Sequence, residues 1–152
     1  MVERKLIVGL GNILLKDEGV GMRCVEFLRN RGLGRDVKIV DGATLGVDLL
    51  EEIKGFDRVV LVDAVDMGKE PGYIASFRAE ELLMIADEIK FSLHEFNLVD
   101  VIKLGKQLGH DLSNVKIVGI QPKEVGWGDR LSNIIEEKLP ELAVRVLSEL
   151  ED

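Results

Sequence analysis

The segment VGLGNILLKDEGVG (residues 8–21) decides how the rest of this 152-residue chain is interpreted. It follows an aliphatic run, and it holds four glycines and the acidic pair Asp17 and Glu18. A glycine-rich turn after a first strand is typical of a phosphate site at the start of a helix. Two carboxylates beside a phosphate would repel it, so the segment predicts a different ligand.

Continuous β-branched runs predict the strands of a sheet. Such runs are typical of parallel strands that are buried on both faces. They are KLIVGL (5–10), VKIVDG (37–42), DRVVLVDAVD (57–66) and VKIVGI (115–120). A further segment, GYIASF (72–77), follows a Pro-Gly turn too closely for a parallel crossover, so we expect an antiparallel edge strand there.

Apolar residues at helical spacing lie between these runs and predict four helices. Their apolar faces fall within residues 20–28, 49–53, 98–108 and 139–150, and Pro140 is expected to start or kink the last helix. Alternating strands and helices predict an α/β three-layer sandwich: a mostly parallel twisted sheet of about five strands, with one antiparallel edge strand and helices on both faces. With no linker or repeat, residues 1–152 are expected to form a single domain.

The composition excludes several classes of protein. The net charge of −8 and the pI of about 4.9 argue against a nucleic-acid partner, which needs a positive surface. Cys24 is the only cysteine, so neither an intramolecular disulfide nor an all-cysteine metal site is possible, and we expect it in the core. No run is apolar enough for a signal peptide or a membrane span, which predicts a cytoplasmic protein without a membrane partner.

Five motifs in order resemble the hydrogenase maturation endopeptidase family. GLGNILLKDEGVG resembles the glycine-rich signature of that family. Its later motifs resemble DGATLG (41–46), VLVDAVD (60–66), SLHEFNLVDVI (92–102), and VGIQP (118–122) followed by GWGDRLS (126–132). Ala43 and Gln121 depart from the Gly and Glu that are common in the family.

The resemblance implies an endopeptidase that removes a C-terminal extension from the large-subunit precursor of a nickel–iron hydrogenase after nickel insertion. It implies nickel binding by Glu18, Asp63 and His94, with the ion presented by the substrate. Zinc or cadmium is expected to occupy the same site. Asp41 and Glu18 are the candidates for a general base that activates water.

The local chemistry is compatible with these roles. Ligands of open α/β sheets bind beyond the carboxyl ends of the strands, where Asp63 is expected. Asp17 is expected to cap the first helix, which leaves Glu18 to face the strand ends. The SLHE pattern predicts a capping box, with His94 in the first helical turn and kept neutral by the helix dipole. One imidazole and two carboxylates suit Ni, Zn, Co or Mn.

Other functions stay open from the sequence. A non-proteolytic checkpoint or chaperone that senses nickel loading needs the same ligands. LIVGLGN (6–12) also resembles the opening of peptidyl-tRNA hydrolases, but the catalytic histidine of that family is absent. A dinucleotide fingerprint would need glycine where Leu14 stands. Trp127, between two glycines, predicts either a partner-binding anchor or a packed side chain.

Overall fold

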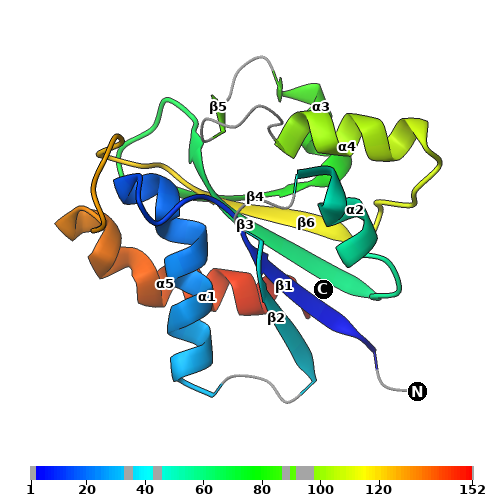
Figure 1. The fold of residues 1–152 in the computed structure, drawn as a ribbon, viewed down its shortest axis with the longest axis horizontal. Coiled ribbons are helices and arrows are strands. Elements are labelled where there is room, and N and C mark those ends of the chain that lie inside the picture. The colour runs from blue at the N-terminus through cyan, green and yellow to red at the C-terminus, as the bar shows by residue number, and fades with distance from the viewer. Residues whose placement is uncertain (1–2, 33–35, 43–45, 87–89, 92–97, 152) are drawn as a thin grey trace.

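The computed structural model describes residues 3–32, 36–42, 46–86, 90–91 and 98–151. Within these ranges six strands form one sheet, which crosses the centre of the molecule (Figure 1). The strands are β1 (Lys5–Gly9), β2 (Val37–Asp41), β3 (Arg58–Asp66), β4 (Ile74–Arg78), β5 (Lys90–Phe91) and β6 (Val115–Ile120). Their order is β2-β1-β3-β6-β4, and β5 pairs with β3 outside this path.

The pairing confirms the predicted fold class. Strand β1 lies parallel to β2 and β3, and β3 lies parallel to β6. Strand β4 is antiparallel to β6 at the edge, as predicted for the segment after the Pro-Gly turn. The two-residue strand β5 was not predicted, because two residues carry no recognisable periodicity.

Helices cover both faces of the sheet and give three layers. They are α1 (Val20–Asn30), α2 (Leu49–Glu52), α3 (Ala79–Met84), α4 (Leu98–Gln107) and α5 (Asn133–Glu149), with 3-10 turns η1 (Lys16–Gly19) and η2 (Gly46–Asp48). Figure 1 shows α1 and α5 on one face and α2, α3 and α4 on the other. Among the helices described here, none has both the length and the apolar character needed to cross a bilayer.

Helix α5 begins earlier than the sequence predicted. It starts at Asn133, seven residues before Pro140, and continues through the proline. Pro140 therefore does not start the helix, and the other predicted effect, a kink at Pro140, stays a prediction. Proline removes one backbone donor from a helix interior, but the buried side chains of Ile135, Leu142 and Val146 pack this helix into the core on both sides of Pro140.

Alternate side chains of each strand face two different apolar clusters. In β3, Val60 and Val62 belong to the cluster beneath α1 and α5. Val59 and Leu61 belong to the cluster beneath α2, α3 and α4. Because side chains alternate along a strand, Asp63 extends to the same face as Leu61.

Candidate functional site

The loop between β1 and α1 depends on a glycine where no other residue fits. Gly11 has a φ of +106°, and an added Cβ would overlap the carbonyl oxygen of Glu18. The same Cβ would lie 3.5 Å from Oδ1 of Asp63. The main chain of Glu18 and the carboxylate of Asp63 therefore border Gly11 from two different elements, η1 and β3. This contact brings two of the three predicted ligand residues to one edge of the sheet.

Asn12 shapes the turn that carries these residues. Its amide donates to the Glu18 carbonyl at 3.3 Å, and its carbonyl accepts the amide of Leu15 at 3.0 Å. Its side-chain oxygen accepts the amide of Leu14 at 2.9 Å, the pattern of an Asx turn. The conformation of Gly11 and the hydrogen bonds of Asn12 thus explain why the sequence motif has this Gly-Asn pair.

Most backbone amides of this loop already donate hydrogen bonds within the protein. Lys16 donates to the Gly128 carbonyl at 2.9 Å, and Asp17 donates to the Glu124 carbonyl at 3.0 Å. With the remaining bonds of the turn, every amide from residue 14 to residue 18 donates to a protein oxygen. Phosphate-binding loops need several amides directed at the ligand. This geometry therefore argues against a phosphate or dinucleotide site.

Asp17 does not cap α1, which corrects the sequence prediction. The N-cap residue is Gly19, and no side chain caps the helix. The fully buried Asp17 carboxylate instead accepts the amides of Lys123, Glu124 and Ser132 and the hydroxyl of Ser132, at 2.7 to 3.0 Å. These partners lie 106 to 115 residues away along the chain. Asp17 thus joins the β1–α1 loop to the segment that leads into α5.

Glu18 lies in the 3-10 turn η1 with only 7% of its surface exposed. Within the described part of the chain, its carboxylate accepts no hydrogen bond and forms no ion pair. Among the residues that the structure describes, no fully buried side-chain oxygen lacks a hydrogen-bond partner, so the unpaired carboxylate oxygens of Glu18 keep contact with solvent. An accessible carboxylate without a protein partner is available to bind a cation at this edge of the sheet.

Asp63 is buried near the carboxyl end of β3, and its Oδ1 accepts the amide of Ala64 at 2.8 Å. The predicted third ligand, His94, lies outside the described residues. In the ranges that the structure covers, no group of three His, Cys, Asp or Glu side chains is arranged to hold a metal. The site of Glu18, Asp63 and His94 thus stays a prediction, of which the structure brings together the first two residues.

Asp41 ends β2 but faces away from Asp63. Its carboxylate pairs with Arg29 of α1 at 2.9 and 3.0 Å. Two residues earlier in the strand, Ile39 packs into the cluster beneath α1 and α5, which is the face opposite to that of Leu61 and Asp63. This placement argues against the predicted role of Asp41 as general base.

Gln121, one of the departures from the family pattern, has a specific role. Its side-chain oxygen accepts the amides of Met67 at 2.7 Å and Lys69 at 3.2 Å. Its side-chain nitrogen donates to Oδ1 of Asp66 at 3.1 Å. Glutamine suits this position because a glutamate could not donate to Asp66. Asp66 therefore holds the turn after β3, where its Oδ1 also accepts the amide of Gly68 at 3.1 Å.

Cys24 lies in the core, as predicted, and cannot serve as a nucleophile. Burial raises the pKa of its thiol to about 12. The reactive species of a cysteine is the thiolate, which is scarce at neutral pH when the pKa is this high.

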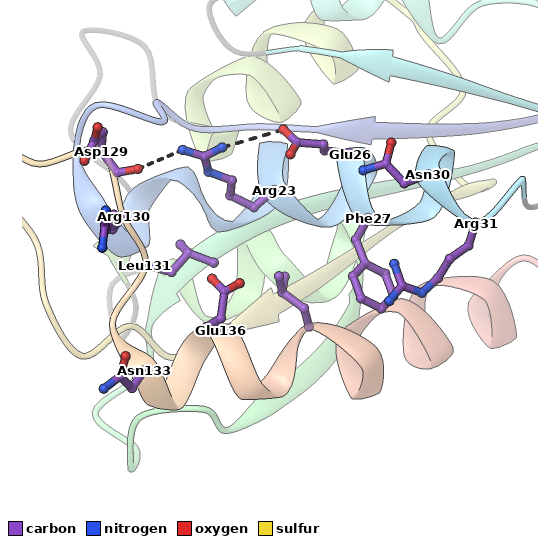
Figure 2. A pocket seen from close by; sticks show the side chains of 11 residues that line it. Arg23, Glu26, Phe27, Asn30, Arg31, Asp129, Arg130, Leu131, Asn133 and Glu136 are labelled. Carbon is purple, nitrogen blue, oxygen red and sulfur yellow. Dashed lines mark hydrogen bonds and ion pairs between the residues drawn. The ribbon is translucent and has the colours of Figure 1, made fainter.

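A cavity of about 490 Å³ lies between α1 and α5 (Figure 2). Figure 2 shows Arg23 reaching both the Asp129 carbonyl, at 2.8 Å, and the Glu26 carboxylate, at 3.6 Å. Its lining includes three arginines and three acidic residues, so their charges offset one another. The cavity is on the face of the sheet opposite to Asp63 and selects no clear class of ligand.

Fold and site together define a class of protein: an α/β sandwich whose glycine-rich loop presents the unpaired carboxylate of Glu18, instead of phosphate-binding amides, at the carboxyl edge of the sheet. The family model described as hydrogenase maturation protease matches residues 22–149. This chain belongs to the hydrogenase maturation protease family.

Individual relatives agree with this assignment. The hydrogenase expression/formation protein HupD of Bradyrhizobium diazoefficiens is 35% identical over 151 residues, which cover 96% of this chain and 79% of the relative. The hydrogenase 2 maturation protease of Escherichia coli (strain K12) is 32% identical over 151 residues, covering 98% and 92%. The solved structure of the hydrogenase maturating endopeptidase HybD from E. coli superposes with a TM-score of 0.83 at 31% identity, covering 97% and 92%. The predicted family is confirmed, and a protease role is supported.

Proposed function

We propose that this protein is the endopeptidase that removes the C-terminal extension from a nickel–iron hydrogenase large-subunit precursor after nickel insertion. In this proposal Glu18, Asp63 and His94 recognise the nickel that the precursor holds. Membership of the hydrogenase maturation protease family supports the protease role. The observation that carries the metal role is the placement of Glu18, whose carboxylate forms no hydrogen bond or ion pair in the described part of the chain and whose main-chain carbonyl borders Gly11, as does Oδ1 of Asp63.

Nickel is part of the substrate in this proposal, because it arrives with the precursor and leaves with the product. Carboxylate and imidazole ligands suit nickel, and zinc or cadmium competes for the same atoms. Three protein ligands leave coordination positions open, which ligands from the precursor can fill. A bound divalent ion can polarise a peptide carbonyl. Glu18 becomes the preferred candidate for the general base, since Asp41 is paired with Arg29 on the other face.

Two other functions make different predictions. A nucleotide- or tRNA-directed enzyme is disfavoured because the loop amides from residue 14 to residue 18 are occupied and the net charge is −8. A nickel-loading checkpoint would bind the loaded precursor through the same residues without cutting it.

Intact-mass spectrometry of the nickel-loaded precursor, incubated with and without this protein, separates protease from checkpoint. We expect the mass to fall by one C-terminal peptide. Glu18→Gln and His94→Ala should abolish this change, whereas the control Glu26→Gln, on the exposed side of α1, should not. A precursor that binds the wild-type protein but keeps its full mass would favour the checkpoint instead.

A further inference from the structure

Two neighbouring loops at the carboxyl edge of the sheet expose large apolar side chains. Ile13 and Leu14 lie on the β1–α1 loop, and Val125 and Trp127 lie on the loop before α5. Trp127 is 82% exposed, so it does not pack against the part of the chain that the structure describes. Single apolar residues are common on protein surfaces, but a group of them is a sign of an interaction site. We call these four residues the apolar patch.

Backbone hydrogen bonds join the two loops. Leu14 accepts the amide of Gly128 at 2.9 Å, and Gly128 in turn accepts the amide of Lys16 at 2.9 Å. Lys16 has a φ of +52°, a left-handed value that a non-glycine residue keeps only when its surroundings impose it. The buried Asp17 carboxylate, on the first loop, accepts the amides of Lys123 and Ser132 at the two ends of the second loop. Both loops lie at the same end of the sheet in Figure 1.

We infer that the apolar patch is the docking surface for the folded large-subunit precursor, and that it contacts an apolar area of the precursor next to the C-terminal extension. This inference rests on the proposed function. Glu18 lies on the same loop as Leu14. When the scissile peptide bond of the precursor lies at Glu18, the precursor surface around that bond therefore faces the apolar patch. Tryptophan often dominates the binding energy of an interface. A preformed patch also loses little conformational entropy on binding.

The size of the patch favours a transient partner over a second copy of this chain. Four partly exposed side chains offer on the order of a few hundred Å² of apolar surface. A stable dimer of standard size buries roughly 800 Å² on each partner. The charged residues Lys16, Lys123 and Glu124 lie close to the patch residues in the sequence, in keeping with the polar rim of an interface that must open again after cleavage.

Steady-state processing of the nickel-loaded precursor tests the inference. Trp127→Ala and Leu14→Ala should each raise KM, by about tenfold for the tryptophan, with kcat within about twofold of wild type. Leu108→Ala is the matched control, since Leu108 is 63% exposed against 53% for Leu14, and it follows α4 at the amino end of β6. If the two patch variants behave like Leu108→Ala while the wild type cuts normally, the docking inference fails and the proposed function stands.

A second measurement reads docking without cleavage. Trp127 is the only tryptophan, so protein labelled with 5-fluorotryptophan has a single ¹⁹F resonance. Adding unlabelled nickel-loaded precursor should shift this resonance, even if the precursor is not cut. An unchanged resonance at a precursor concentration that saturates processing would overturn the inference. A resonance that shifts with the concentration of this protein alone would also overturn it, because the patch would then be a self-association surface.

Discussion

Asp17 and Ser132, which are 115 residues apart in the sequence, share two hydrogen bonds in the protein interior. Oδ1 of Asp17 accepts the amide of Ser132 at 2.8 Å, and Oδ2 accepts its hydroxyl at 2.7 Å. Both residues are buried. Because Glu18 follows Asp17 directly, these bonds fix the main chain from which the Glu18 side chain extends. The two members of the acidic pair thus have separate roles, one structural and one available to a ligand.

Replacing Asp17 should destabilise the whole protein. Asp17→Ala leaves one buried and two partly buried backbone amides without their acceptor, and we expect the free energy of unfolding to fall by about 3–5 kcal/mol. Ser132→Ala removes only the hydroxyl bond and should cost about 1 kcal/mol. Urea denaturation of the two variants measures both values. If Asp17→Ala costs only the roughly 1 kcal/mol typical of a lost helix cap, the structural role assigned to Asp17 is wrong.

Replacing Gly11 should disturb the site and the fold together. In Gly11→Ala the new methyl group meets the Glu18 carbonyl and approaches Asp63, so the loop must move and binding of cadmium should be lost. Gly109→Ala is the control, because Gly109 also has a positive φ, +83°, but in the described part of the chain no atom lies near its added Cβ. That variant should cost about 1–2 kcal/mol of stability and keep the metal site. Calorimetric titration with cadmium distinguishes them, and equal affinity of both variants would contradict the placement of Glu18 and Asp63.

Asp41→Asn should leave catalysis nearly unchanged. The substitution removes an exposed ion pair with Arg29, which is worth about 0–1 kcal/mol of stability. Because Asp41 faces the opposite side of the sheet from Asp63, kcat for the precursor should stay within about twofold of wild type. A general base contributes about 10²- to 10⁴-fold to a rate. A fall in kcat of that size would contradict this prediction and support Asp41 as the general base.

The thiol of Cys24 should be unreactive in the folded protein. With its pKa raised by burial to about 12, roughly one thiol in 10⁴ is ionised at pH 8. Ellman's reagent should therefore label Cys24 only after unfolding, and Cys24→Ala should retain processing. Since the folded pKa lies above the unfolded value of 9.0, the stability contributed by the protonated thiol is complete below pH 9 and is lost as the pH rises toward 12. Rapid labelling of the folded protein at pH 8 would contradict this.

Much of the fold could be predicted from the sequence because its strands are continuous β-branched runs and its helices have one apolar face. The parts that were missed or misplaced carry weak local signals. Strand β5 has two residues and helix α3 has six. The first two turns of α5 precede Pro140, where a proline pattern suggested a helix start.

The candidate site was predictable to a lesser extent. The proximity of Glu18 and Asp63 could be predicted, because parallel strands end at a common edge of the sheet. The partners of Asp17 could not be predicted, because they are backbone amides more than 100 residues away. The orientation of Asp41 depends on which cluster Ile39 contacts, and a strand that is apolar on both faces does not reveal this in its sequence.

The account depends most directly on whether nickel in the precursor licenses cleavage. The decisive measurement is intact-mass spectrometry of nickel-loaded and nickel-free large-subunit precursor, each incubated with the wild-type protein under the same conditions. The account predicts that only the nickel-loaded precursor loses its C-terminal extension. Equal cleavage of the two forms would contradict it.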